Sequence, residues 1–346
     1  MTDSVTIALD VMGGDHGADS VLPAAVSQLK ADPSLRLILV GDESLIRERL
    51  KALGPAPEDR MVVHHASEQI EMGEPPMQAL RGKPDSSMRV GLNLLRDGEA
   101  QAFVSAGNTG ALVALSHFVV RMLPGIDRPA IQSTVPALNG HTHVLDLGGN
   151  VDSRAEHLLQ FAVMGSVLAQ ELDDNPSPRV GLLNVGEENI KGNRQVQAAD
   201  ILLRESKLNY IGYIEGDDIY CGEVDVVVCD GFVGNISLKT TEGVARMLTT
   251  SLKEEFKRNL YSRLAMILAA PILKGFRRLF DPRRYNGASL LGLRHVVIKS
   301  HGSADAFAFE QAIVRAQQEA RRDLPMQIDQ NIDTLLADRV EASVES

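Results

Sequence analysis

Short apolar runs alternate with longer amphipathic segments along most of this 346-residue chain. The runs are rich in Val, Ile and Leu, as buried strands are, and most are followed by a glycine-containing turn and then by helical periodicity. We predict strands at residues 6–11, 35–40, 60–66, 101–104, 131–137, 142–147, 179–185, 210–214, 224–229 and 295–299. We predict helices at 19–30, 43–53, 86–96, 153–172 and 304–321, and two more that end near residues 122 and 206. This alternation predicts an α/β fold, with a parallel, doubly wound sheet between two helical layers in a three-layer αβα arrangement.

Segment 72–88 interrupts the alternation. Its prolines and glycines break regular structure, so we predict a loop there. Arg81 and Lys83 would project positive charge from this loop.

The stretch from Val224 to Lys239 contains the repeated unit in its clearest form. An apolar strand ends on Asp230, a turn spans Gly231 to Gly234, and a helix is predicted to begin at Asn235. The start of a helix offers unpaired backbone N–H groups and the positive end of a dipole, and glycines let a ligand approach the backbone closely. This stretch therefore predicts an anion site.

Other predicted strands also end on a polar residue beside glycine. These strand ends are Asp10, Ser105, Asp146, Asn184 and Ser300, in addition to Asp230. Each one alone is typical of a helix cap or a turn, where Asp, Asn and Ser bond to the local backbone. Because the carboxyl ends of parallel strands meet at one edge of a sheet, six such ends together favour a shared binding site over six independent caps.

Composition and charge restrict the class of protein. Hydrophobic residues make up 44% and charged residues 23%, which is an ordinary globular balance. We predict one elaborated domain at residues 1–324, followed by a C-terminal helix and mobile tail at 325–346. The net charge of −11 argues against a nucleic-acid-binding protein.

The ends and the cysteines indicate the compartment. The first residues lack a basic region followed by an apolar core, so we expect no signal peptide, and no apolar run reaches the ~18 residues of a membrane span. Cys221 and Cys229 form no CxxC motif, which argues against a disulfide scaffold or a zinc site. We expect a protein of the reducing cytoplasm.

Several familiar cofactor and nucleophile motifs are absent from the sequence. There is no GxxxxGK[ST] loop, no GxGxxG after the first strand and no GxSxG elbow, so we predict no nucleotide or other cofactor and no metal. Cys229 lies in an apolar run and Cys221 in a turn, and we interpret both as packing residues rather than nucleophiles. Five histidines without a motif around them are interpreted as structural: His64, His65, His117, His141 and His143.

Residues 253–284 depart from the acidity of the chain, with nine Lys or Arg against three acidic residues. Apolar residues lie between the charges, and Pro271 splits the helical pattern, so we predict two short amphipathic helices that meet at a bend. An apolar tip with basic flanks is typical of an anchor at an anionic membrane surface, and the same charge could receive an acidic carrier protein. A helix pair that forms a dimer is the structural alternative. The contact residues are predicted to be Lys257, Arg258, Leu264, Ile267, Leu268, Lys274, Arg277 and Arg278.

Six motifs in order along the chain closely resemble the bacterial phosphate acyltransferase family of phospholipid synthesis. They are residues 10–15 (DVMGGD), 79–81 (ALR) with 85–88 (DSSM), 105–112 (SAGNTGAL), 186–188 (GEE) with 191–193 (KGN), 229–235 (CDGFVGN) and 298–304 (IKSHGSA). The resemblance implies an enzyme that converts acyl-acyl carrier protein and inorganic phosphate into acyl phosphate. It also implies a fold related to isopropylmalate dehydrogenase and phosphate acetyltransferase, a homodimer, and peripheral association with a membrane whose glycerol-3-phosphate acyltransferase would accept the product.

This chemistry needs no nucleophile from the protein, because phosphate itself can attack the thioester. We expect Lys191 to stabilise phosphate or the oxyanion, Asn235 to donate to the oxyanion, and His301 to protonate the leaving thiolate. Phosphate and the acyl group are expected to contact Asp10, Gly13, Gly14, Asp15, Arg81, Ser105, Gly107, Asn108, Thr109, Gly110, Asp146, Asn150, Asp230, Gly231 and Gly234.

Three alternatives share parts of this pattern. A short-chain phosphate acetyltransferase would have the same fold. A β-decarboxylating dehydrogenase would need a metal-binding carboxylate cluster and an arginine clamp, which we cannot assemble from the sequence. A non-catalytic membrane scaffold for lipid enzymes would need only the basic segment.

Overall fold

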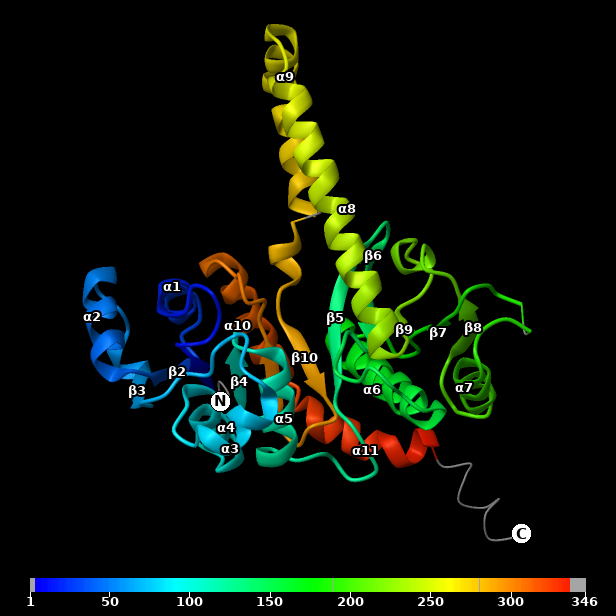
Figure 1. The fold of residues 1–346 in the computed structure, drawn as a ribbon, viewed down its shortest axis with the longest axis horizontal. Helices are drawn as coiled ribbons and strands as arrows, with labels where there is room; N and C mark the ends of the chain where they lie inside the picture. Colours follow the sequence, from blue (N-terminus) through cyan, green and yellow to red (C-terminus); the bar gives the residue numbers. More distant parts are fainter. Residues whose placement is uncertain (1–3, 189, 280, 337–346) are drawn as a thin grey trace.

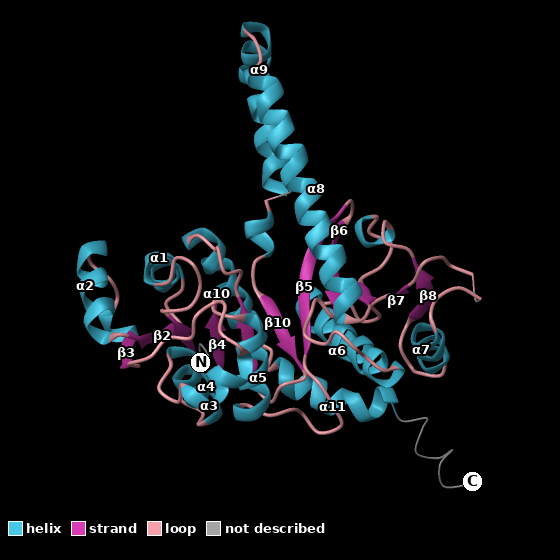
Figure 2. Ribbon diagram, viewed as in Figure 1, coloured by secondary structure: helices cyan, strands magenta, loops and turns pink. Residues whose placement is uncertain are grey.

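A mixed sheet of eleven strands organises the molecule (Figures 1 and 2). The computed structural model describes residues 4–188, 190–279 and 281–336, and the side chains of 276–279, 333 and 336 lie outside that description. The strand order is β3-β2-β1-β4-β11-β10-β5-β6-β9-β7-β8.

The sheet consists of two parallel sets of strands joined by an antiparallel centre. The "β1 half" contains β1 (Val5–Asp10), β2 (Leu35–Gly41), β3 (Met61–His65), β4 (Ala102–Ser105) and β11 (Val296–Lys299). The "β9 half" contains β6 (Gly140–Leu145), β7 (Val180–Leu183), β8 (Tyr210–Ile214) and β9 (Val226–Val228). Between them lie β5 (Ala130–Ala137) and β10 (Ala288–Leu291).

The centre reverses the direction of the strands. The pairs β11–β10, β10–β5 and β5–β6 are all antiparallel, so the strands of the β1 half run opposite to those of the β9 half. The sequence predicted a sheet that is parallel throughout, which holds only within each half. Strand β10 was not predicted, because its four residues, ASLL, include no β-branched or aromatic residue that would indicate a strand.

Helices cover both faces of the sheet, which confirms the predicted three-layer α/β fold. Their bounds are α1 (Ala18–Ala31), α2 (Glu43–Leu53), α3 (Pro76–Gly82), α4 (Ser87–Arg96), α5 (Thr109–Val119), α6 (Ala155–Asp173), α7 (Arg194–Arg204), α8 (Gly231–Lys257), α9 (Leu260–Leu279), α10 (Ala306–Arg321) and α11 (Leu324–Leu336). Short 3-10 turns lie at η1 (Glu58–Arg60), η2 (Asp218–Tyr220) and η3 (Pro282–Tyr285).

The alternation of side chains along β1 divides the core of the β1 half into two layers. Ile7 and Leu9 pack with α1 and α10, whereas Ala8 packs on the opposite face with α4 and α5. In the β9 half, α6 lies against one face together with α7 and α11. The first turns of α8 lie on the other side, where Leu238 packs against the same core as Val227. Helix α11 contributes buried Ile328 and Ile332, and residues 337–346 of the expected tail lie outside the described residues.

Two predicted element boundaries are wrong. Part of the expected loop at 72–88 is helix α3, because Pro76 occupies its first turn, where the missing N–H of proline leaves no bond unmade. Helix α8 begins at Gly231 rather than Asn235, because the carboxylate of Asp230 accepts bonds from the N–H groups of Phe232 and Val233, both at 2.9 Å.

Helices α8 and α9 form a long hairpin that projects from the body (Figure 1). The bend lies at residues 258–259 and not at Pro271, which is contained within α9. Asn259 sets the turn, because its side-chain oxygen accepts a bond of 2.8 Å from the N–H of Ser262 and so caps the second helix.

Candidate functional site

Asp10, at the end of β1, lies at the centre of a buried polar cluster. It is 1% exposed, and its two carboxylate oxygens accept hydrogen bonds from the hydroxyls of Ser87 and Ser105, both at 2.7 Å. Burial raises the pKa of the carboxyl group, although these bonds oppose the shift. Asp10 therefore joins β1, α4 and β4 beneath the adjoining loops. Ser87 was not among the predicted site residues, although it lies in the 85–88 (DSSM) motif, because nothing in the sequence shows that this segment reaches the end of β1.

The two glycines after β1, Gly13 and Gly14, are required because neighbouring atoms approach their backbone too closely for a side chain. A Cβ atom on Gly13 would lie 2.5 Å from Oδ2 of Asp10 and 2.8 Å from the backbone N of Gly107. Gly14 has a positive φ of 88°, and a side chain there would meet Ala106. The loops after β1 and β4 therefore pack backbone against backbone. Exposed Asp15 extends this contact, because its N–H donates to the carbonyl of Gly302 after β11 at 2.8 Å.

Lys299 contributes a buried cation to the same cluster. Its side chain enters from the end of β11, is 8% exposed, and donates to the carbonyl oxygens of Ala106, at 3.1 Å, and of Ser300. Burial lowers the pKa of this ammonium group to about 8, while the charges of Asp10 and Asp15 oppose that shift. The sequence analysis did not select Lys299. The sequence feature that could have indicated it is the position of a lysine at the end of an apolar run, Val296–Lys299.

The 105–110 loop makes structural hydrogen bonds that the sequence did not indicate. The side-chain amide of Asn108 donates to the carbonyl oxygens of Met72 and Glu74, both at 2.9 Å, and its oxygen caps α5 through the N–H of Ala111. Thr109 and Gly110 are exposed in the first turn of α5, and a Cβ atom on Gly110 would lie 2.8 Å from Pro76 of α3. Arg81 is exposed on α3.

Asp146, after β6, forms a second buried centre. Its carboxylate accepts bonds from the N–H groups of Ile131 and Gly149, both at 2.9 Å, and from the backbone N–H of Asn150 at 2.6 Å. The side-chain amide of Asn150 adds a bond of 2.9 Å. Burial raises the pKa of Asp146, and the four bonds oppose that shift. Asp146 thus fixes the loop after β6 to the start of β5.

The start of α8 packs directly on this second centre. A Cβ atom on Gly231 would lie 2.5 Å from the carbonyl oxygen of Asn150, and one on Gly234 would lie 1.9 Å from that of Asp146. Both glycines are therefore needed for packing. Cys229 is buried nearby, and burial raises the pKa of its thiol, which is consistent with the packing role predicted for it.

Helix α8 connects the two centres. Exposed Asn235 adjoins Gly148, whose Cβ would lie 3.4 Å from that of Asn235. One turn later, the charge of Lys239 acts on both Lys299 and His301 of the β1 half. Partial burial is the main cause of the lowered pKa of His301, and Lys239 lowers it further. The ring Nδ1 of His301 lies 2.9 Å from the hydroxyl of Ser303.

Lys191 lies apart from these groups. It is exposed in the loop after β7, and its ammonium nitrogen is 3.9 Å from a carboxylate oxygen of Glu188. Gln197 holds the neighbouring backbone by donating to the carbonyl of Lys191 at 3.3 Å. Within the described residues, no hydrogen bond or ion pair joins Lys191 to the other predicted site residues.

Most of the predicted site residues lie in two groups with α8 between them, whereas Lys191 belongs to neither group. The group of the β1 half contains Asp10, Gly13, Gly14, Asp15, Ser105, Gly107 and His301, with Lys299 and Ser87 added by the structure. The group of the β9 half contains Asp146, Asn150, Asp230, Gly231, Gly234 and Asn235. A single shared edge is not formed, because the two sets of strands run in opposite directions.

The helical hairpin is exposed in its apolar and basic parts. Leu264, Ile267 and Leu268 are 57%, 66% and 76% exposed. Lys257, Arg258 and Lys274 are also exposed, whereas the side chains of Arg277 and Arg278 lie outside the described residues. No helix in the described part of the chain is long and apolar enough to cross a membrane.

Comparisons with known proteins identify relatives over nearly the whole chain. The family described as "Fatty acid synthesis protein" matches residues 5–327. A phosphate acyltransferase of Alkalilimnicola ehrlichii is 58% identical over 337 residues, which cover 97% of this chain and 98% of that protein. A phosphate acyltransferase of Methylococcus capsulatus is 55% identical over 334 residues, covering 96% and 98%.

Solved structures of lower identity share the fold. A phosphotransacetylase from Streptococcus pyogenes has a TM-score of 0.61 at 19% identity and covers 92% of this chain and 94% of its own. A branched-chain phosphotransacylase from Enterococcus faecalis has a TM-score of 0.54 at 13% identity, covering 91% and 99%. At these identities the likeness shows the fold alone, and it confirms the phosphate acetyltransferase-like architecture expected from the sequence.

Proposed function

Because the chain belongs to the phosphate acyltransferase family, we propose that it transfers a long-chain fatty acyl group from acyl-acyl carrier protein to inorganic phosphate. The product would be an acyl phosphate for phosphatidic acid and phospholipid synthesis. The observation that carries this proposal is identity of 58% to a phosphate acyltransferase across 97% of the chain.

Phosphate is the nucleophile in the proposed reaction. Its second pKa is near 6, by analogy with phosphoryl groups, so it is largely dianionic at neutral pH and needs orientation rather than activation. Lys299 supports a phosphate position in the β1 half, because it is a cation beside the 10–15 and 105–110 loops with two of its three N–H donors in use. Exposed Thr109 and Gly110 at the start of α5 would add backbone N–H donors.

We assign stabilisation of the oxyanion to groups outside the β1 half, on α8 and in the loop after β7. Attack on the thioester carbon places negative charge on its oxygen, and exposed Asn235 and Lys191 could both donate to it. Lys191 is free enough to move toward substrate, because its pairing with Glu188 is long, at 3.9 Å. Arg81 is a further exposed cation that could contact phosphate.

Collapse of the tetrahedral intermediate releases the carrier thiolate. Thiols have pKa values near 8.5, so this leaving group needs little protonation. His301 is placed to assist, since it is exposed beside Lys299 and its lowered pKa keeps the ring neutral at neutral pH. A neutral ring gives up its own N–H proton less readily than an imidazolium does, so His301 would help mainly by hydrogen bonding.

The helical hairpin supports a location at the membrane surface. We propose a cytoplasmic protein, peripherally bound to anionic lipid through the exposed apolar and basic residues of α9, which could pass acyl phosphate to a membrane glycerol-3-phosphate acyltransferase.

A homodimer is also proposed. Apolar residues remain exposed along α8, including Val244, Met247 and Leu248, and a second copy would cover them. The basic residues of the hairpin could also receive the acidic carrier protein.

Release of free thiol from a long-chain acyl-acyl carrier protein tests the function. We expect release that depends strictly on added phosphate, together with formation of acyl phosphate. A clear preference for acetyl-CoA would favour the short-chain phosphate acetyltransferase alternative. Absence of thiol release would favour the membrane scaffold, whereas thiol release without phosphate would indicate hydrolysis of the thioester and contradict the proposed transfer to phosphate.

A further inference from the structure

The β5–β6 hairpin and the end of α6 bring together three side chains that the proposed reaction does not use. The Nε2 atoms of His141 and His143 lie 3.0 and 2.7 Å from the two carboxylate oxygens of Asp173. One ligand atom from each residue can be chosen so that all three lie within 4.8 Å of one another. We propose that His141, His143 and Asp173 form a binding site for a divalent metal ion of the zinc type.

The local structure explains why two imidazoles face the same point. His141 and His143 are two residues apart on β6, and alternate residues of a strand project from the same face. Asp173 is the last residue of α6, and it reaches them from a position 30 residues after His143. Because the third ligand is distant in sequence, the motif was not visible there, and both histidines were interpreted as structural.

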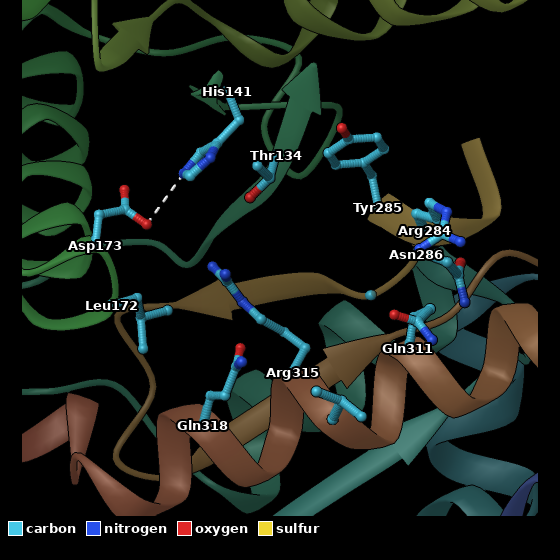
Figure 3. Close-up of a pocket in the computed structure, with 12 residues that line it drawn as sticks. Thr134, His141, Leu172, Asp173, Arg284, Tyr285, Asn286, Gln311, Arg315 and Gln318 are labelled. Carbon is cyan, nitrogen blue, oxygen red and sulfur yellow. Dashed lines mark hydrogen bonds and ion pairs between the residues drawn. The ribbon is translucent and has the colours of Figure 1, made fainter. Parts of the chain in front are cut away.

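The identity of the ligands favours zinc over the harder cations. Imidazole nitrogen together with one carboxylate oxygen suits Zn²⁺ and its neighbours in the first transition row, whereas Mg²⁺ and Ca²⁺ prefer oxygen ligands alone. Three protein ligands leave at least one position open in a four-coordinate site. Here an adjoining cavity of about 290 Å³, lined by His141, Asp173, Thr134, Arg315 and others, can hold the remaining ligand (Figure 3).

The residues behind His143 determine how its ring can bind a metal. The ring is 1% exposed, and its Nδ1 lies 3.0 Å from the hydroxyl of Thr134 and 2.9 Å from the amide nitrogen of Gln132. Metal bound at Nε2 requires the proton on Nδ1, and Thr134 can accept it. Gln132 must then turn its amide, which gives up the bond of 3.0 Å between its oxygen and Arg315.

The charge around the site is compatible with a dication. Arg315 lies in the wall of the cavity, but its Nε donates at 2.6 Å to Glu319, which is 2% exposed and offsets that charge. Arg284 is more exposed and stacks over Phe307, 5.6 Å from its ring centre. Asp173 supplies the negative charge directly to the metal. A bound ion would fasten the β5–β6 hairpin to α6.

Titration of the chelator-treated, full-length protein with Zn²⁺ tests the proposal. We expect one Zn²⁺ per chain by calorimetry, an affinity reduced at least about 100-fold in His141→Ala, and a similar loss in Asp173→Ala. His141 is 36% exposed in its side chain, so its removal should leave the fold intact. His117→Ala, an exposed histidine on α5, is the matched control and should bind as the wild type does.

Two changes behind the ligands distinguish a metal site from a purely hydrogen-bonded cluster. Gln132→Glu should tighten Zn²⁺ binding about 10-fold, because a carboxylate accepts the Nδ1 proton and still pairs with Arg315, whereas Thr134→Val should weaken it about 10-fold. Zn²⁺ should also raise the melting temperature of the wild type and not that of His141→Ala. Equal Zn²⁺ affinity in the wild type, His141→Ala and Gln132→Glu would overturn the proposal.

Discussion

At the scale of single residues, Lys299 has the most distinctive environment. An ammonium group that is 8% exposed loses hydration, and two carbonyl oxygens with two nearby carboxylates replace only part of it. Its pKa of about 8 in the folded protein lies below the usual 10.5. The unfolded chain therefore binds more protons between these values, and this residue's contribution to folding stability rises with pH across that window.

The same shift predicts how catalysis depends on pH. Lys299 is charged below pH 8 and neutral above it, so kcat/KM for phosphate should fall as the pH rises through about 8. In Lys299→Arg the charge persists, and the falling limb should move to higher pH. Initial rates at subsaturating phosphate measure the effect. An unchanged limb in the arginine variant would remove Lys299 from the phosphate site.

Lys191 provides an independent prediction. Lys191→Ala should lower turnover at least about 100-fold, the scale of losing one donor to a transition state, with an unchanged circular dichroism spectrum. The control is Lys207→Ala, which also removes an exposed lysine from a loop, here the connection between α7 and β8, and should retain activity. Near-normal acyl phosphate formation by folded Lys191→Ala would refute the assignment.

The polar residues at strand ends could be identified from the sequence, but their hydrogen-bond partners could not. Asp10 and Asp146 were selected correctly as polar strand ends that lie at loops. The two hydroxyls that bind Asp10 come from different elements, and the amide of Asn108 is bonded to carbonyls more than 30 residues away. Such long-range bonds leave no local pattern, so the structural bonds of Asn108 could not be predicted, and its contact with phosphate stays a prediction.

At the scale of elements, the start of α8 is held by close packing. Gly234→Ala should destabilise the protein by at least about 2 kcal/mol, because its new Cβ would lie 1.9 Å from the carbonyl oxygen of Asp146 and the helix would have to shift. Gly243→Ala on the same helix meets nothing within 4 Å and should stabilise by about 1 kcal/mol. Urea unfolding of both variants gives the comparison. Equal stabilities would show that the contact is relaxed in solution.

The exposed face of α9 predicts binding to anionic vesicles. Ile267→Glu with Leu268→Glu should abolish sedimentation with phosphatidylglycerol liposomes, since it places charge where apolar side chains would enter the lipid interface. Arg277→Glu with Arg278→Glu should weaken binding in a salt-dependent manner. Val62→Glu, at a 61% exposed position on β3, controls for a surface change elsewhere. If the wild type fails to sediment, the hairpin has another role.

At the scale of the whole molecule, the unpaired apolar residues of α8 predict a dimer. Light scattering on the eluting protein should give twice the chain mass of 37.5 kDa, and Met247→Glu with Leu248→Glu should shift it toward the monomer. Phe118→Glu, an equally exposed apolar position on α5, should leave the dimer intact. A monomeric wild type would contradict the prediction.

Most individual strands could be predicted, but their arrangement in the sheet could not. Periodicity reports how many faces of a strand are buried, and β1, β2 and β4 were found in this way. It does not report direction, so the reversal produced by β10 and β5 was missed, and with it the division of the site residues into two groups. The α8–α9 bend was misplaced because Pro271 was a stronger local signal than Asn259.

The pairing of β11 with β4 has a consequence for how this protein is made. Val296 pairs with Ala102, and Phe309 and Ile313 of α10 fill the same core layer as Ile7. A nascent chain that has left the ribosome as far as α5 still lacks one strand and one helix of its first core. Those pieces are among the last to be synthesised, so the β1 half stays open to solvent and to chaperones until translation is nearly complete.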